Sequence, residues 1–254
     1  MPRKQHPILF QTEMVQAIDE DRKTMTRRTT GLEGINVNPD AWTLNVCGFV
    51  ARLAIGNRKL KEGNGAIFRN RELQPKLVFC PYGKVGDLLW VRESFSNNED
   101  GTFDYKADYP FTKPQGGWKP SIHMPKKAAR IILEITDIRI ERLNDISEDD
   151  AIAEGVLEFE DGTFKNYFTQ KGFRAEDGVE CLLAKGSFQS LIASINGKNI
   201  IDLNPWVWVI KFKVLSKNGY PFNGNGGIEA VETTVSAGIV NYDKEPLDSL
   251  IKTT

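Results

Sequence analysis

The sequence contains few of the residues that bind metals or form disulfide frameworks: three cysteines and two histidines among 254 residues. Cys47, Cys80 and Cys181 lie far apart, and no CxxC pair occurs. Neither a zinc ribbon nor a disulfide scaffold is therefore expected. This cysteine usage fits a reducing compartment, and we expect no metal and no cofactor.

Charge of one sign and long apolar runs are also absent. The 33 lysines and arginines nearly balance the 34 aspartates and glutamates, so any nucleic-acid binding must rely on a local basic patch. No apolar run approaches the length of a membrane-spanning helix, and the first residues, MPRKQHP, lack the apolar core of a signal peptide. We expect a cytoplasmic protein that does not bind a membrane.

Internal repeats and glycine-rich phosphate loops of the GxGxxG or Walker type do not occur. Apolar residues alternate in some segments and recur at helical spacing in others, so both strands and helices are predicted. The segment 24–30 is either a strand or an extended arm. The other strands are predicted at 7–10, 42–46, 88–93, 103–108, 131–142 and 205–215, and the helices at 13–20, 147–155 and 181–195, the last with a break near Gly186.

The segment RKTMTRR, residues 22–28, concentrates four cations and two hydroxyls. Like charges repel unless water or an anion lies beside them. Lysine and arginine donors with interleaved threonine hydroxyls suit a phosphate or an oxyanion. The segment is either a solvated basic turn or one wall of a ligand pocket. In the second interpretation the pocket residues are Lys23, Thr26 and Arg28, and the solvated ones are Arg22 and Arg27.

One acidic residue near the end of the second predicted helix is not explained by that helix. Ser147 is a good N-cap with Asp150 three residues later, and Gly155 ends the helix. The acidic residues of the first turn suit the helix dipole, but Glu154 lies at the opposite end, where the dipole disfavours a negative charge. We therefore predict a cationic partner for Glu154.

Two further groups of residues are candidates for ligand contacts. Arg92 and Glu93 end a predicted core strand, where they either line a site or form a structural ion pair. The loop that follows contains aromatic side chains that can stack on bases, and a histidine between two prolines. The ligand- or phosphate-binding residues predicted from the sequence are Arg22, Arg28, Arg92, Glu93, Trp118 and His123.

The order of these motifs resembles the ASCH superfamily, whose β-barrel is related to the PUA RNA-binding fold. The segment RKTMTRR comes first, GDLLWV at 86–91 second, the long strand and the helix up to Glu154 third, and WVIKF at 208–212 last. The resemblance implies an α+β fold, namely a PUA-like barrel with a few helices, elaborated by insertions.

Two shorter segments, WKPSIHMP and NPWVW, resemble phage- and prophage-encoded ASCH proteins more narrowly. A phage origin would place the protein in the host-cell cytoplasm. The ASCH domain is expected to span 1–215, with insertions at about 31–75 and 156–178. Residues 216–254 form a C-terminal extension that we expect to pack lightly or not at all.

Compact bacterial members of this superfamily include amidohydrolases that deacetylate N4-acetylcytidine. By motif position, their catalytic Lys, Thr and Glu correspond to Lys23, Thr26 and Glu154. The resemblance implies that Thr26 attacks an amide carbonyl, that a desolvated Lys23 is its base, and that Glu154 moves a proton or orients the amine. Arg28 or Arg92 would hold the oxyanion or a phosphate.

Three functions are therefore predicted as alternatives. The first is a phage protein that binds RNA, DNA or a nucleotide in a cleft lined by the basic segment. The second is an amidohydrolase that acts on N4-acylcytidine-type nucleosides. The third is a non-catalytic protein that interacts with a host protein. The sequence predicts no oligomeric state.

Overall fold

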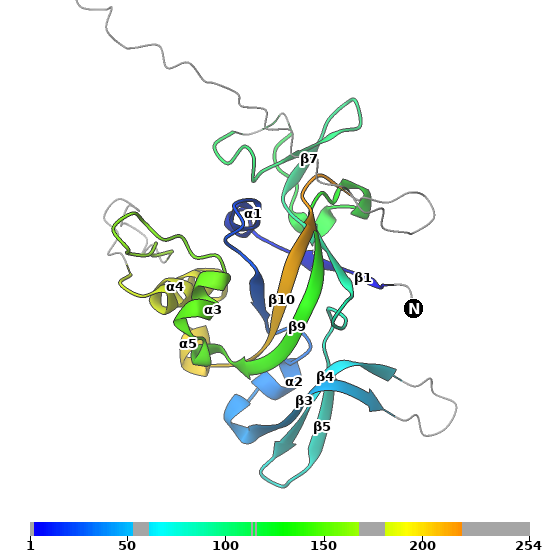
Figure 1. Cartoon of the computed structure of the whole chain (residues 1–254), viewed down its shortest axis with the longest axis vertical. Coiled ribbons are helices and arrows are strands. Elements are labelled where there is room, and N and C mark those ends of the chain that lie inside the picture. The colour runs from blue at the N-terminus through cyan, green and yellow to red at the C-terminus, as the bar shows by residue number, and fades with distance from the viewer. Residues whose placement is uncertain (1–2, 53–60, 113, 115, 168–180, 220–254) are drawn as a thin grey trace, which may run out of the picture. The chain divides into compact units, whose positions relative to one another are not determined.

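The computed structural model describes residues 3–52, 61–112, 114, 116–167 and 181–219. These residues form three β-sheets and several short helices, which confirms the predicted α+β class (Figure 1). The described strands do not close into the barrel that the resemblance implies. The predicted C-terminal extension lies almost entirely outside the described residues.

Five strands form the largest sheet: β1 (Gln5–Leu9), β2 (Met25–Arg28), β6 (Leu88–Arg92), β9 (Ile132–Arg142) and β10 (Trp206–Ser216). Their order is β1-β6-β9-β10-β2, which makes β1 and β2 the two edges. β1 pairs with β6 in parallel, and the other neighbours pair antiparallel. The last four residues of the segment RKTMTRR therefore form an edge strand, β2, and not an extended arm.

The predicted insertion and a hairpin form the two smaller sheets. β3 (Trp42–Arg52), β4 (Lys61–Asn70) and β5 (Pro75–Phe79) make a three-stranded antiparallel sheet, which confirms the strand predicted at 42–46. β7 (Phe95–Asn97) pairs with β8 (Phe103–Tyr105) around the turn predicted between them.

Five α-helices are described: α1 (Thr12–Asp19), α2 (Glu33–Asn36), α3 (Glu148–Ala153), α4 (Ala184–Asn196) and α5 (Asn199–Leu203). The helices α3, α4 and α5 lie together beside β9 and β10 (Figure 1). Short 3₁₀ turns occur at Pro39–Ala41, Ser121–His123, Lys126–Ala128 and Leu143–Asp145.

The helix boundaries agree with the predictions in part. The Ser147 hydroxyl accepts a hydrogen bond from the Asp150 backbone N–H at 3.2 Å, as expected of an N-cap. Thr12 is not a cap but the first residue of α1, and Gln11 precedes it without a side-chain cap. The predicted break near Gly186 does not occur, because glycine is tolerated in a helix whose apolar side is buried. The sequence does not predict α5, which is too short for a recognisable apolar period.

Hydrophobic residues pack on both faces of the large sheet. On one face, Trp208 is buried in the same cluster as Phe68 of β4. On the other face, Val209 is buried in the same cluster as Phe188 of α4. Successive residues of β10 reach different clusters because side chains alternate along a strand. The β3–β5 sheet and the helices α3 and α4 therefore cover opposite faces of the sheet.

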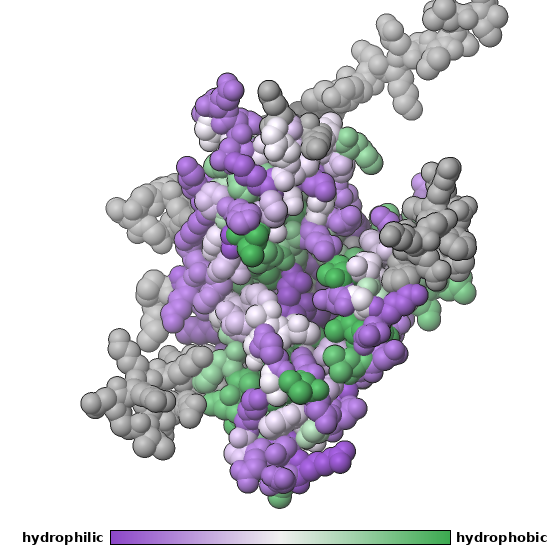
Figure 2. All heavy atoms as spheres, turned by 180° about the vertical axis from the view of Figure 1, so that it is seen from behind, coloured by the Kyte–Doolittle hydropathy of each residue, from purple (hydrophilic) through white to green (hydrophobic). Residues whose placement is uncertain are grey.

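The surface mixes hydrophobic and hydrophilic residues. Seen from behind, hydrophobic residues form several small groups that hydrophilic residues separate (Figure 2). None of the described helices is both long enough and apolar enough to cross a membrane.

Gly155, which follows α3, gives a test of the packing between this helix and the basic segment. Its backbone has φ +87°, and a Cβ atom added there would lie 2.8 Å from the Cβ atoms of both Ala17 and Lys23. We predict that Gly155→Ala lowers the free energy of unfolding by about 2–4 kcal/mol, from backbone strain plus overpacking. Urea denaturation measures the change.

Gly162→Ala is the matched control for this substitution. Gly162 has a similar φ of +80°, but nothing lies within 4 Å of an added Cβ atom. We expect only the strain to remain, a loss of about 1–2 kcal/mol. Equal losses in the two variants would contradict the close packing at Gly155.

Candidate functional site

Lys23 is buried and paired with Glu154. The backbones of the two segments meet, because the Thr24 N–H donates to the Ala153 carbonyl oxygen at 2.9 Å, beside an isolated β-bridge between Lys23 and Glu154. The Lys23 Nζ donates to the backbone oxygen of Glu154 at 2.6 Å and to its Oε2 at 2.7 Å. The cationic partner predicted for Glu154 is thus confirmed.

Arg27 is a second cation bound to Glu154. Its Nη1 donates to Glu154 Oε1 at 3.1 Å, its Nε to Glu141 Oε1 at 2.9 Å, and its Nη2 to Asp150 Oδ2 at 2.8 Å. Arg139 of β9 also donates to Asp150. The prediction that Arg27 is solvated is wrong, because the alternation of β2 directs its side chain toward α3 and these carboxylates.

Burial and pairing have opposite effects on the two cations. Burial lowers the pKa of the Lys23 ammonium below its ordinary value, although the Glu154 carboxylate acts to raise it. Burial also acts to lower the pKa of Arg27, but Glu154 and Glu141 outweigh it, and that pKa is raised. A buried cation is costly without its counter-charge. Lys23 therefore depends on Glu154, whereas Arg27 shares its charge among Glu154, Glu141 and Asp150.

Arg28 connects the two edge strands of the large sheet. Its Nη2 donates to the Leu9 carbonyl oxygen at 2.7 Å, and its guanidinium carbon lies 5.0 Å from the centroid of the Phe10 ring. Thr26 and Arg28 lie on the opposite face of β2 from Arg27. The Arg28 side chain thus bridges the end of β1 and the strand β2.

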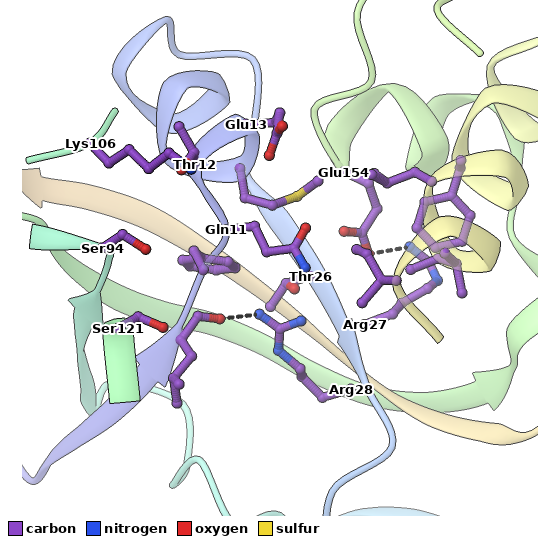
Figure 3. Close-up of a pocket in the computed structure, with 17 residues that line it drawn as sticks. Gln11, Thr12, Glu13, Thr26, Arg27, Arg28, Ser94, Lys106, Ser121 and Glu154 are labelled. Atoms are coloured by element: carbon purple, nitrogen blue, oxygen red, sulfur yellow. Dashed lines mark hydrogen bonds and ion pairs between the residues drawn. The ribbon is translucent and has the colours of Figure 1, made fainter. Parts of the chain in front are cut away.

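A pocket of about 560 Å³ lies between these two edges (Figure 3). The side chains of Thr26 and Glu154 line it, and the Thr26 hydroxyl makes no hydrogen bond to another described residue. Further polar side chains of the lining come from Gln11, Arg28, Ser94, Lys106 and Ser121.

Helix α4 supplies four apolar residues of the lining, and the segment from β1 to α1 supplies Leu9, Phe10 and Met14. Phe188, Leu191, Ile192 and Ile195 are spaced by one, three or four residues, which places them along one side of the helix. The sequence predicts the helix from this pattern but not its role as a pocket wall. An apolar stripe indicates that one side of a helix is covered, but it does not indicate whether protein side chains or a pocket lie against that side.

The predicted catalytic residues are brought together, but not all face the pocket. Thr26 and Glu154 line it, whereas Lys23 lies behind Glu154 and is not part of the lining. Arg22 donates to the Gly155 carbonyl oxygen at 2.6 Å and also lies outside the lining. Lys23 therefore reaches the pocket only through the carboxylate that it binds.

Arg92 and Glu93 have other partners. Arg92 donates to the Ile122 carbonyl oxygen, and Glu93 is buried and accepts two hydrogen bonds from Arg130, at 2.9 and 3.0 Å. Neither residue lines the pocket. Glu93 therefore forms a structural ion pair, with Arg130, and does not line the site.

Trp118 and His123 are also outside the lining. The Trp118 Nε1 donates to the Thr112 carbonyl oxygen at 2.9 Å, and His123 is exposed at the end of a 3₁₀ turn. In that turn it is Ser121 that lines the pocket. The sequence points to Ser121 only in that this residue lies two positions before the predicted His123.

Ser94 and Lys106 are lining residues that the sequence does not predict. Ser94 directly follows the predicted Glu93, but its side chain points to the pocket while that of Glu93 binds Arg130. Lys106 is an ordinary surface lysine in the sequence. Only the folding of the β7–β8 hairpin beside α1 identifies it.

The chain matches no protein-family model, no curated protein and no solved structure. Within the described ranges, no group of three or more His, Cys, Asp or Glu side chains is placed to hold a metal ion.

Glu154 binds both Lys23 and Arg27. We therefore predict that removing the Glu154 charge destabilises the protein more than removing the Lys23 charge. We expect Glu154→Gln to lower the free energy of unfolding by about 3–5 kcal/mol, because it leaves Lys23 buried without a counter-charge. Lys23→Met should cost less, about 1–2 kcal/mol, because Glu154 keeps Arg27 and the methionine fills much of the same space. Chemical denaturation followed by circular dichroism measures both.

Asp149→Asn is the matched control, since it removes a carboxylate from an exposed position of α3. We expect it to change the free energy of unfolding by less than about 0.5 kcal/mol. If Glu154→Gln were no more destabilising than this control, the buried pairing would be contradicted.

Proposed function

We propose that the pocket binds one nucleobase, as part of a nucleoside, a nucleotide or an unpaired position of RNA or DNA. The observation that carries this proposal is the pocket between the two edge strands, which combines polar side chains with the apolar side of α4, next to Arg27 and Glu154 (Figure 3). Its volume of about 560 Å³ and its mixed lining are typical of small-molecule sites. The ASCH resemblance supports the same class of ligand.

Glu154 supplies an acceptor for a base that carries an amino group. A carboxylate has about four lone-pair positions. Lys23 takes one on Oε2 and Arg27 takes one on Oε1, which leaves acceptor capacity for a donor in the pocket. The exocyclic amino group of cytosine or adenine is such a donor. The Thr26 hydroxyl, which can donate or accept, lies in the same lining.

The apolar wall suits the faces of a base. Phe188, Leu191 and Ile192 offer a surface on which a flat, weakly hydrated ring can be buried. Burial of such a ring favours binding without selecting one base, because every base has an apolar face. Selection would come from Glu154 and Thr26.

Thr26 provides the test of this binding. We expect cytidine or adenosine to bind the wild-type protein in isothermal titration calorimetry. Thr26→Val removes the hydroxyl and keeps the shape, so affinity should fall by about 5- to 10-fold, the value of one hydrogen bond. Thr26→Ser keeps the hydroxyl and should change affinity by less than about 3-fold.

The proposal fails if neither nucleosides nor short single-stranded RNA and DNA bind at low salt. For RNA and DNA this is the most favourable condition, because phosphate contacts are strongest at low ionic strength.

We propose, as a second function, hydrolysis of an acyl group from an N4-acylated cytidine. It is favoured by Glu154, which contacts the buried Lys23 and lines the same pocket as Thr26. The Thr26 hydroxyl oxygen would form a bond to the amide carbonyl carbon while its proton passes to Glu154. The C–N bond then breaks, and the amino group leaves with that proton. Water hydrolyses the threonine ester, which releases the carboxylic acid and restores the hydroxyl.

The positions of Lys23 and Arg28 relative to the pocket decide their roles in this mechanism. Lys23 does not line the pocket, so it orients Glu154 and does not itself take the proton from Thr26. Arg28 lines the pocket and would stabilise the negative charge on the carbonyl oxygen.

Incubation with N4-acetylcytidine, followed by chromatography, tests the hydrolase. We expect the wild-type protein to form cytidine and Thr26→Val to be at least about 100-fold slower, because the nucleophile is removed. Thr26→Ser should keep measurable activity. No cytidine from the wild type, or equal rates for wild type and Thr26→Val, would contradict hydrolysis and leave the binding proposal in place.

The third predicted function, a non-catalytic contact with a host protein, stays a prediction. Exposed hydrophobic residues of the described chain include Val37 and Phe111, on separate segments. Scattered exposed residues of this kind are normal on a protein surface and favour no particular partner.

A further inference from the structure

We propose that the ligand carries a terminal phosphate, held by Arg28, Lys106, Ser94 and Ser121 on the side of the pocket away from Glu154. The ligand class is then a nucleoside monophosphate whose base has an amino group. This inference rests on the proposed nucleobase binding and adds a second subsite to the same pocket.

Two cations of the lining are available to an anion. Arg28 uses its Nη2 on the Leu9 carbonyl oxygen, which leaves further N–H donors of the guanidinium. The Lys106 ammonium has no hydrogen bond or ion pair with another described residue. Arg27 is different, because three carboxylates surround it. The charge offered to a ligand therefore comes from Arg28 and Lys106.

Lys106 and the two hydroxyls occupy one side of the pocket. In Figure 3, Ser94, Lys106 and Ser121 lie across the pocket from Glu154. The Lys106 backbone N–H donates to the Ser94 carbonyl oxygen at 2.9 Å, which fixes these two residues together. The carbonyl oxygen of the residue after Lys106 accepts from Gln16 Nε2 at 2.9 Å, which attaches this segment to α1. These bonds hold the backbone that carries Ser94 and Lys106 beside α1, while the Lys106 ammonium stays free to move to a ligand.

The number of charges matches one phosphate monoester. Such a group carries a charge of about −1.5 to −2 at neutral pH and has three acceptor oxygens. Arg28, Lys106 and two hydroxyls can satisfy these oxygens. Glu13 also lines the pocket, and its carboxylate opposes the binding of further negative charge. The lining therefore favours a monophosphate over a diphosphate or a triphosphate.

Isothermal titration of the full chain compares cytidine monophosphate, cytidine and inorganic phosphate. We expect the monophosphate to bind about 10- to 100-fold more tightly than cytidine, because charge-assisted hydrogen bonds are added. Cytidine diphosphate and triphosphate should bind no more tightly than the monophosphate. Inorganic phosphate alone should bind weakly, since it lacks the base.

Lys106→Met separates the phosphate subsite from the base subsite. We expect it to weaken monophosphate binding by about 10-fold and cytidine binding much less. Lys4→Met is the matched control, since it removes the same charge from an exposed lysine outside the lining, and it should leave both affinities unchanged.

The possible failures are distinguishable. Equal affinities for the monophosphate and cytidine would overturn the phosphate subsite and leave nucleobase binding intact. Absence of binding by both would overturn the two proposals together. A trinucleotide that binds more tightly than the monophosphate would overturn the terminal phosphate in favour of an internal position of a chain.

Discussion

The buried contact between Glu154, Lys23 and Arg27 fixes the edge of the large sheet at which the pocket lies. Glu154 directly follows α3, whereas Lys23 lies two residues before β2 and Arg27 lies within it. Neither cation can stay buried without a carboxylate, and the carboxylate is satisfied only if both elements keep their positions. Glu154 also borders the pocket. One side chain thus links the packing of α3 on β2 to the surface that a ligand meets.

The pocket exists because the five-stranded sheet leaves two edges. Free strand edges are commonly covered by other elements, since their backbone groups can pair with another chain. Here α1 connects β1 to β2, Arg28 bridges from one edge to the other, and the apolar side of α4 lies beside them. The lining therefore combines residues from separate parts of the chain, and the segment from β1 to α1 supplies both polar and apolar side chains.

The sequence predicted the parts of this site that local physics determines. The helix dipole singled out Glu154, and the alternation of a short strand is consistent with Thr26 and Arg28 on one face. The burial of Arg27 was not predicted, because it depends on Glu141 and Asp150, which are more than a hundred residues away. Lys106 and Ser121 escaped prediction for the same reason, since their loops meet only in the folded chain.

The strands and most helices followed from apolar patterns, but their assembly did not. Patterning indicates which side of an element is covered, and it does not indicate the order of strands in a sheet or what covers a helix. The order β1-β6-β9-β10-β2 and the role of α4 are properties of the whole chain. The described strands leave two open edges instead of the closed barrel that the resemblance implied, while the α+β class is confirmed.

The most direct test of the central claim is heteronuclear NMR of the lysine Nζ–H groups. Exposed ammonium hydrogens exchange rapidly with water, whereas a buried, hydrogen-bonded ammonium is protected. We predict one slowly exchanging lysine signal that is lost in Lys23→Met and that shifts when a nucleoside binds, because Glu154 contacts both. No protected signal, or a protected signal that no ligand shifts, would contradict the claim that one carboxylate joins the buried cations to the pocket.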